Sequence, residues 1–131
     1  MNGLDHVAIL VSDLDAAVKL YRDVYGLELA EIEDVPSEKV RVAIFGHGAG
    51  RIELVSPSGP DSPMAKAIEK RGEGLHHIGY RVDDCAAALA AMVAAGATPI
   101  DAAPRPGSRG TTVAFVHPKG SFGTLIELVQ E

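Results

Sequence analysis

The chain has 131 residues, of which 47% are hydrophobic and 23% charged, and its formal net charge is −6 at pH 7. This is the size and composition of one domain that can bury its own core, and the negative balance argues against a nucleic-acid surface, which needs clustered lysine and arginine. No apolar run approaches the roughly 20 residues that span a bilayer. Cys85 is the only cysteine and no secretory leader is visible, so we expect a cytoplasmic protein without disulfides.

The first half of the chain predicts a β-α-β-β-β order of elements. Ser12 or Asp13 caps the helix, which ends at Tyr25-Gly26, and Pro36 with the residues after it interrupts the strands that follow. The predicted elements are a strand over 3–11, the helix, and strands over 27–33, 40–45 and 51–55.

The second half repeats this order after a connector rich in proline and glycine. The connector includes a short predicted helix over 64–70. The predicted elements of the second half are a strand over 74–82, a helix over 84–95, a short strand over 98–101, a loop over 103–110, and strands over 111–116 and 124–129. One module leaves a sheet edge open, so pairing the two modules is the natural way to complete the fold.

We therefore predict a single α+β domain spanning residues 1–131. It consists of two tandem βαβββ modules, about 1–58 and 73–131, with a connector over 59–72.

The two modules also repeat individual residues. The segment 4–13 aligns with the segment 75–84, and this alignment places His6 on His77. His76 precedes His77, but strand alternation sends adjacent side chains to opposite faces, so we expect only His77 to reach a shared site.

The last strand of each module carries a carboxylate among apolar residues, Glu53 in the first and Glu127 in the second. A carboxylate that points into the concave face of a sheet is costly unless it is paired or bound to a cation. Taken singly, a histidine at a strand start or a glutamate within a strand is more often an ordinary structural or surface residue. Because both types recur at matching places, and because two imidazoles with two carboxylates suit a divalent first-row metal, we predict a metal site. Its ligands are His6, Glu53, His77 and Glu127.

Three cations, Arg105, Arg109 and Lys119, lie in loops rich in glycine and proline in the second module. They are either solvated loop charges or ligands for the phosphates of a long anionic molecule, and we favour binding.

These residues resemble the vicinal oxygen chelate superfamily, which includes glyoxalases and bleomycin resistance proteins, and within it the methylmalonyl-CoA epimerase family. The His-Pro-Lys sequence over 117–119 is the most specific part, because glyoxalase I relatives more often have Asp-Pro-Asp-Gly there. The similar segments are 5–8, 40–43, 52–54, 72–78, 115–119 and 125–129.

The resemblance implies a metal-dependent isomerase that interconverts the 2-epimers of methylmalonyl-CoA by proton abstraction and return through a metal-stabilised enolate. It implies that the two modules form a cupped, incompletely closed mixed sheet around a metal site. It also implies the same four metal ligands, a divalent metal (cobalt, with nickel, manganese or zinc as alternatives) and a homodimer. Inversion needs an acid/base group on each face of the enolate, and the resemblance assigns one to Glu127. The other is a glutamate in the loop before the third strand. In an alignment without gaps, Ser37 stands at the position of this glutamate. If the loop is shifted by one residue, Glu38 takes that position and becomes the candidate.

Two alternatives use the same scaffold. A glyoxalase-like metal-dependent lyase or isomerase would act on a hemithioacetal, with Glu53 or Glu127 as base. A metal-free drug-binding protein would need none of the four ligands, and their presence counts against it.

Overall fold

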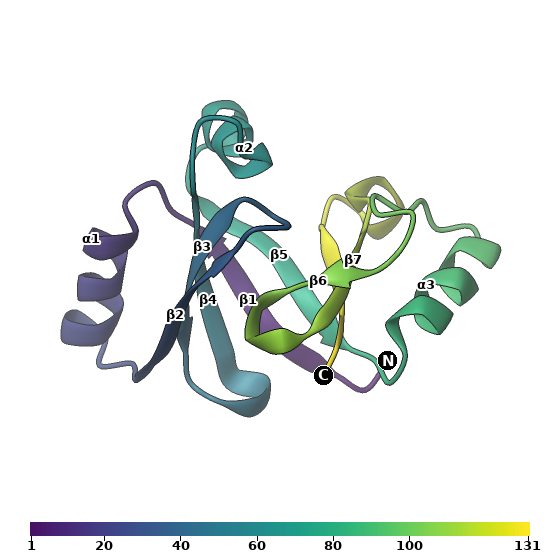
Figure 1. The fold of residues 1–131 in the computed structure, drawn as a ribbon, viewed down its shortest axis with the longest axis horizontal. Helices are drawn as coiled ribbons and strands as arrows, with labels where there is room; N and C mark the ends of the chain where they lie inside the picture. The colour runs from purple at the N-terminus through teal and green to yellow at the C-terminus, as the bar shows by residue number, and fades with distance from the viewer.

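All 131 residues are described by the computed structural model, and they form one eight-stranded mixed sheet with three helices. The sheet curls into a half-barrel, with α1 and α3 on its outside and α2 at its rim (Figure 1). The strands are β1 (Leu4–Leu10), β2 (Leu29–Val35), β3 (Val40–Phe45), β4 (Arg51–Pro57), β5 (Gly74–Arg81), β6 (Arg105–Pro106), β7 (Thr112–Val116) and β8 (Ile126–Gln130). The helices are α1 (Leu14–Lys19, continued by a π-helical turn, Leu20–Val24), α2 (Pro63–Arg71) and α3 (Cys85–Ala94). The predicted fold class is confirmed.

The strand order, β2-β3-β4-β1-β5-β8-β7-β6, places the first strands of the two modules side by side at the centre of the sheet. Within each module the first strand pairs in parallel with the last, β1 with β4 and β5 with β8, whereas β1 and β5 pair antiparallel. The two strands that carry the repeated histidines are therefore direct neighbours. Each is flanked by the strand that carries its own module's glutamate.

The helices begin where the repeat predicts. Asp13 and Asp84 are the N-caps of α1 and α3, and each carboxylate accepts a hydrogen bond of 3.0 Å from the backbone N–H three residues later. Ser12, the other candidate cap, instead donates its hydroxyl to Glu73. Gly26 follows α1 with φ of +73°, the left-handed conformation expected of a residue that ends a helix.

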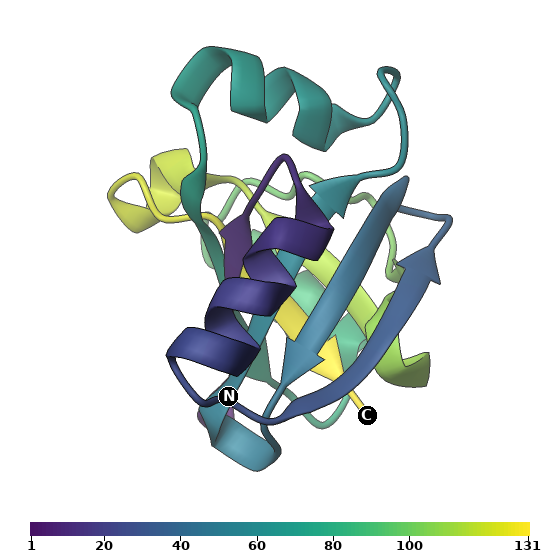
Figure 2. The same cartoon turned by 90° about the vertical axis from the view of Figure 1, so that its left-hand side faces the viewer.

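α1 and α3 each cover the convex face of their own module. α1 lies across β3 and β4 (Figure 2), and α3 packs against β7 and β8. Leu54 on β4 and Leu128 on β8 hold equivalent places in these two layers, and both are 0% exposed. The convex face carries two of the three apolar clusters of the core. The concave face combines the third cluster, which includes Val42 and Val55, with the buried polar side chains of the central cavity. None of the helices combines the length and apolar character needed to cross a membrane.

Two details of the second module differ from expectation. The strand predicted over 98–101 is reduced to a single bridge from Pro99 to Val116, because proline lacks the N–H that a longer ladder would need. Residues 105–106, predicted as loop, form the short edge strand β6 instead.

The two buried leucines provide a test of the fold. Leu54→Ala and Leu128→Ala should each lower the free energy of unfolding by about 2–5 kcal/mol, because each leaves a cavity under a helix. Urea denaturation followed by circular dichroism measures this, with Leu75→Ala as the matched control because Leu75 is 63% exposed. Losses no larger than that of the control would contradict the placement of these side chains in the core.

Candidate metal centre

Two β-bulges set the direction of the site's side chains. Between β1 and β5, Leu4 pairs with Tyr80 and His6 with Gly79, so Asp5 is an extra residue in β1. The same strands have a second shift, which leaves His76 as the extra residue in β5. A bulge places two residues of one strand opposite one of its partner and breaks the alternation of faces. Each extra residue therefore lies beside the histidine that follows it, instead of facing away.

Strand alternation alone would separate His76 from His77, but their Nδ1 atoms lie 2.8 Å apart. In the first module the corresponding contact joins His6 Nδ1 to Asp5 Oδ2 at 2.7 Å. In both modules this contact leaves the Nε2 atom of the predicted ligand, His6 or His77, facing the concave side of the sheet. His77 lines the central cavity, and His76 lines a larger cavity next to it.

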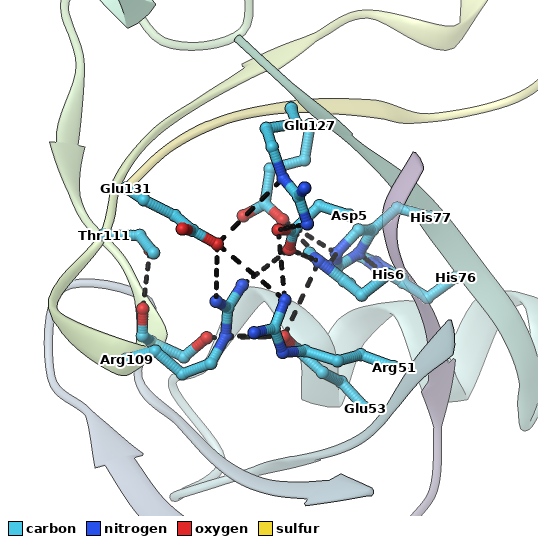
Figure 3. A network of polar contacts seen from close by, with 12 residues as sticks. Asp5, His6, Arg51, Glu53, His76, His77, Arg109, Thr111, Glu127 and Glu131 are labelled. Atoms are coloured by element: carbon cyan, nitrogen blue, oxygen red, sulfur yellow. Dashed lines mark hydrogen bonds and ion pairs between the residues drawn. The ribbon is translucent and has the colours of Figure 1, made fainter. Parts of the chain in front are cut away.

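Three of the four predicted ligands converge on one point (Figure 3). The Nε2 atoms of His6 and His77 are 3.1 Å apart, and they lie 3.1 and 3.2 Å from Oε1 of Glu127. An ion with ligand bonds of about 2.1 Å has neighbouring ligands about 3.0 Å apart if octahedral and about 3.4 Å apart if tetrahedral. The observed triangle fits one face of such a polyhedron. The cavity beside it has a volume of about 10 Å³, room for one water or ion.

Glu53, the fourth predicted ligand, borders this triangle without completing it. Its Oε2 lies 3.6 Å from His6 Nδ1 and accepts a hydrogen bond from the Ser108 hydroxyl at 3.4 Å. Burial raises the pKa of Glu53, because the positive charge of neighbours such as His6 compensates only in part for the lost water. A buried carboxylate with one weak hydrogen-bond partner is available to a cation in the same cavity.

The pKa values of His6 and Glu127 reflect the need of this site for positive charge. Burial would lower the pKa of His6, but the hydrogen bonds to Asp5 and Glu127 outweigh burial and raise that pKa to about 10. Burial would raise the pKa of Glu127, but the charges and hydrogen bonds of His77 and His6 hold it well below its ordinary value. A proton on His6 thus supplies the positive charge that the carboxylates require, and a divalent cation would supply it better.

Gly79 provides the space for the His6 ring. The two residues are paired across β1 and β5, and a Cβ added at Gly79 would clash with Cε1 and Nδ1 of His6. The repeat mirrors this arrangement, because Ala8 pairs with His77. The sequence holds a signal for this role that strand periodicity does not reveal: in both modules a small residue stands two positions after the histidine.

Glu38 reaches the same cavity from the turn between β2 and β3. Lys39 ends this turn in the left-handed conformation, with φ of +55°. Ser37, the residue at the family's aligned position, donates its hydroxyl to the carbonyl oxygen of Pro106 at 2.6 Å. The Glu38 carboxylate lies 3.1 Å from Arg105 Nη1. The structure thus places Glu38, and not Ser37, in the cavity lined by the predicted metal ligands.

The environment of Glu38 suits proton transfer near neutrality. Burial and the negative charge of Glu127 raise the pKa of Glu38 to about 7, against the opposing effect of the Arg105 guanidinium. Carboxyl groups with perturbed pKa values in a shared cavity are candidates for acid/base roles.

The three predicted phosphate ligands lie in different environments. Arg105 lines the larger cavity, of about 540 Å³, and its guanidinium also pairs with Asp101 and lies over the ring of Phe115. Arg109 points inward, where its Nη2 lies 2.5 Å from Asp5 Oδ2. Lys119 is exposed on the helical turn Pro118–Ser121.

Residues 5–115 match the family model of the Glyoxalase/Bleomycin resistance protein/Dioxygenase superfamily. The chain is 41% identical to the ethylmalonyl-CoA/methylmalonyl-CoA epimerase of Cereibacter sphaeroides, over 97% of this chain and 96% of that protein. It is 33% identical to the lactoylglutathione lyase of Haemophilus influenzae, over 95% and 90%. Among solved structures, a methylmalonyl-CoA epimerase variant of Streptomyces coelicolor in complex with 2-nitronate-propionyl-CoA superposes with a TM-score of 0.95 at 36% identity, over 100% of this chain and 98% of that one.

The close approach of His6 to Gly79 yields a prediction. Gly79→Ala should lower the affinity for a divalent metal roughly tenfold or more, because the new methyl group displaces a ligand ring while the strands remain paired. Calorimetric titration of the metal-free protein with cobalt measures the affinity, and circular dichroism checks the fold. Gly50→Ala is the matched control, because a Cβ there meets nothing within 4 Å. Unchanged affinity in a folded Gly79→Ala protein would contradict the proposed ligand geometry.

Proposed function

The chain belongs to the glyoxalase/bleomycin resistance protein/dioxygenase superfamily, and we propose that within it the protein is a metal-dependent isomerase that interconverts the 2-epimers of methylmalonyl-CoA. The observation that carries this proposal is the position of Glu38, which lines the same ion-sized cavity as Glu127 and the two histidines. An epimerase needs two proton-transfer groups at one centre, and these two carboxyl groups come from different modules. The relatives named as epimerases support the choice of substrate.

His6, His77 and Glu127 would hold the metal, with Glu53 as the fourth ligand. A bound divalent ion supplies a Lewis acid for the negative charge that develops on the thioester oxygen when the α-proton leaves. The ligand set of two imidazoles and two carboxylates accepts several first-row ions, and we propose cobalt, ahead of nickel, manganese and zinc.

Glu127 and Glu38 take opposite roles in the proposed proton transfer. Because the histidines hold the pKa of Glu127 low, Glu127 is ionised at neutral pH and can accept the α-proton. Because the pKa of Glu38 is raised to about 7, a large fraction of molecules carry a proton there and can deliver it. Groups whose surroundings push their pKa values apart in this way are suited to opposite roles. In the reverse direction the two exchange roles.

The larger cavity is the proposed path for the rest of the substrate. It shares Glu38 with the central cavity, and its volume of about 540 Å³ lies in the range of small-molecule sites. Lys39 and Arg105 line it, and Lys119 is exposed on a neighbouring turn. We propose that these cations bind the phosphates of the CoA portion, and that Arg109 acts inside the site, beside Asp5.

We also propose a homodimer. The strands β2 and β6 end the sheet on either side and leave unpaired edges, which proteins commonly cover by association. Light scattering coupled to size-exclusion chromatography measures the mass directly.

Proton NMR of methylmalonyl-CoA in D₂O tests the proposed reaction. The cobalt-loaded protein should exchange the α-proton and lose the configuration at that carbon. Glu38→Gln should slow inversion by roughly 10²–10⁴-fold, because one proton-transfer group is lost, while metal binding is retained. Glu31→Gln is the matched control, because the Glu31 side chain on β2 is exposed.

Inversion at the normal rate in Glu38→Gln would contradict the role of Glu38. No exchange by the metal-loaded protein would overturn the epimerase proposal, and the hemithioacetal of methylglyoxal and glutathione then becomes the substrate to test. A chain that binds no divalent metal would favour the drug-binding alternative.

The raised pKa of Glu38 also predicts opposite pH profiles for the two epimers. The kcat/KM for the epimer that receives its new proton from Glu38 should fall as pH rises through about 7, because the acid form is lost. The kcat/KM for the other epimer, whose proton Glu38 removes, should rise over the same interval. Arg105→Gln should move both midpoints to higher pH, because the cation that favours the ionised form is removed.

Initial rates with each purified epimer, measured across neutral pH, give these profiles. Arg41→Gln is the charge-matched control, because the Arg41 side chain is 53% exposed on β3. Midpoints that do not move in Arg105→Gln, or profiles of the same sign for both epimers, would contradict the assignment.

A further inference from the structure

One buried carboxylate of the site has no part in proton transfer and does not face the ligand triangle. Asp5 is 0% exposed, and its Oδ2 accepts the hydrogen bond from Nδ1 of His6 at 2.7 Å. The bulge in β1 makes this contact possible, because without the extra residue the two side chains would lie on opposite faces of the strand. Periodicity along the sequence gives no reason to single Asp5 out.

We propose that Asp5 is a positioning residue for the metal site: it fixes the ring of His6 with Nε2 toward the metal and strengthens that nitrogen as a ligand. The inference rests on the proposed metal-dependent function. A ligand histidine that donates its other ring N–H to a carboxylate is held in one tautomer and one orientation, and it becomes a better donor to the ion.

Three arginines surround the Asp5 carboxylate, and Figure 3 labels two of them, Arg51 and Arg109. Arg109 Nη2 lies 2.5 Å from Oδ2, and Arg51 Nη1 and Arg81 Nη2 lie 3.5 and 3.6 Å from Oδ1. This positive shell keeps a buried carboxylate ionised, which an isolated carboxylate would not be.

The same arginines argue against Asp5 as a metal ligand. Asp5, His6 and Glu53 do bring one ligand atom each within 4.8 Å of one another. Both oxygens of Asp5 are already engaged by cations, however, and a divalent ion there would sit against the three guanidinium groups. Like charges at such separations repel strongly away from water. Asp5 therefore acts through His6 and not on the ion itself.

The second module supplies an internal comparison. His76 holds the position equivalent to Asp5, and its Nδ1 lies 2.8 Å from Nδ1 of His77. No arginine pairs with His76, and a neutral imidazole accepts a hydrogen bond more weakly than a carboxylate. The two ligand histidines are thus both oriented by the residue before them, but only His6 is supported by a full negative charge.

The test is the metal affinity of Asp5→Asn, measured by competition with a chromophoric chelator and cobalt as the metal. Asparagine keeps the shape and an acceptor oxygen but removes the charge. We expect the dissociation constant to rise roughly 10- to 100-fold. We also expect a changed visible spectrum of the bound cobalt, because a differently supported imidazole alters the ligand field. Asp15→Asn, an exposed acid on α1, is the charge-matched control.

A second variant separates positioning from charge balance. Asp5→Asn leaves the arginine shell without its counterion and could unfold the chain, so Asp5→Asn with Arg109→Gln restores the local balance. If Asp5 positions His6, the double variant folds normally and still binds cobalt weakly. If the double variant regains the affinity of the unaltered protein, Asp5 only neutralises the arginines and the inference is overturned.

Two further outcomes also decide the question. Unchanged affinity and spectrum in a folded Asp5→Asn protein would overturn the inference and leave the proposed function intact. Failure of the unaltered protein to bind cobalt, nickel, manganese or zinc would overturn the proposed metal site, and this inference with it.

Discussion

Buried negative charge is the constraint on which the rest of the site depends. Asp5, Glu53 and Glu127 are each at most 4% exposed, and such carboxylates are stable only beside compensating positive charge. The chain provides it in two forms, fixed guanidinium groups around Asp5 and a proton on His6, whose pKa is raised to about 10. The first form is permanent and the second is exchangeable. Metal binding would release the proton and leave the arginine shell in place, so the same cluster can be stable before the ion arrives and reactive afterwards.

The sheet topology explains why this cluster lies where it does. Parallel pairing of the first and last strands within each module places one glutamate beside one histidine, and antiparallel pairing of β1 with β5 joins the two sets. The bulges at Asp5 and His76 then turn one more side chain per module toward each ligand. Gly79 gives the His6 ring its space. The three converging side chains come from both modules, His6 from the first and His77 and Glu127 from the second.

The sequence predicted what depends on local pattern and on the repeat. Strand and helix order and the cap at Asp13 or its neighbour follow from periodicity and alignment, and the structure agrees with them. The choice of His77 over His76 as a ligand stays a prediction from the alignment of the repeat. The expectation that His76 faces away from His77 is wrong, because the bulge brings the two rings into contact. The sequence could not predict the bulges, because register between strands distant in sequence is decided by tertiary packing. The importance of Gly79 was hidden for the same reason. The orientation of Glu38 depends on the left-handed conformation of Lys39, which no periodicity fixes.

The two modules repeat the predicted ligands, but the residue that precedes the histidine differs: Asp5 in the first module and His76 in the second. The larger cavity gives a physical reason for this difference. His76 lines that cavity, whereas Asp5 lies away from it among arginines. Burial and the neighbouring His77 lower the pKa of His76 to about 3, so it stays neutral at the wall past which an anionic acyl thioester would pass. A carboxylate at this position would support His77 more strongly but would repel the substrate carboxylate at short range. A neutral imidazole can orient His77 without that repulsion, so the carboxylate support of His6 lies on the side of the site away from the proposed substrate path.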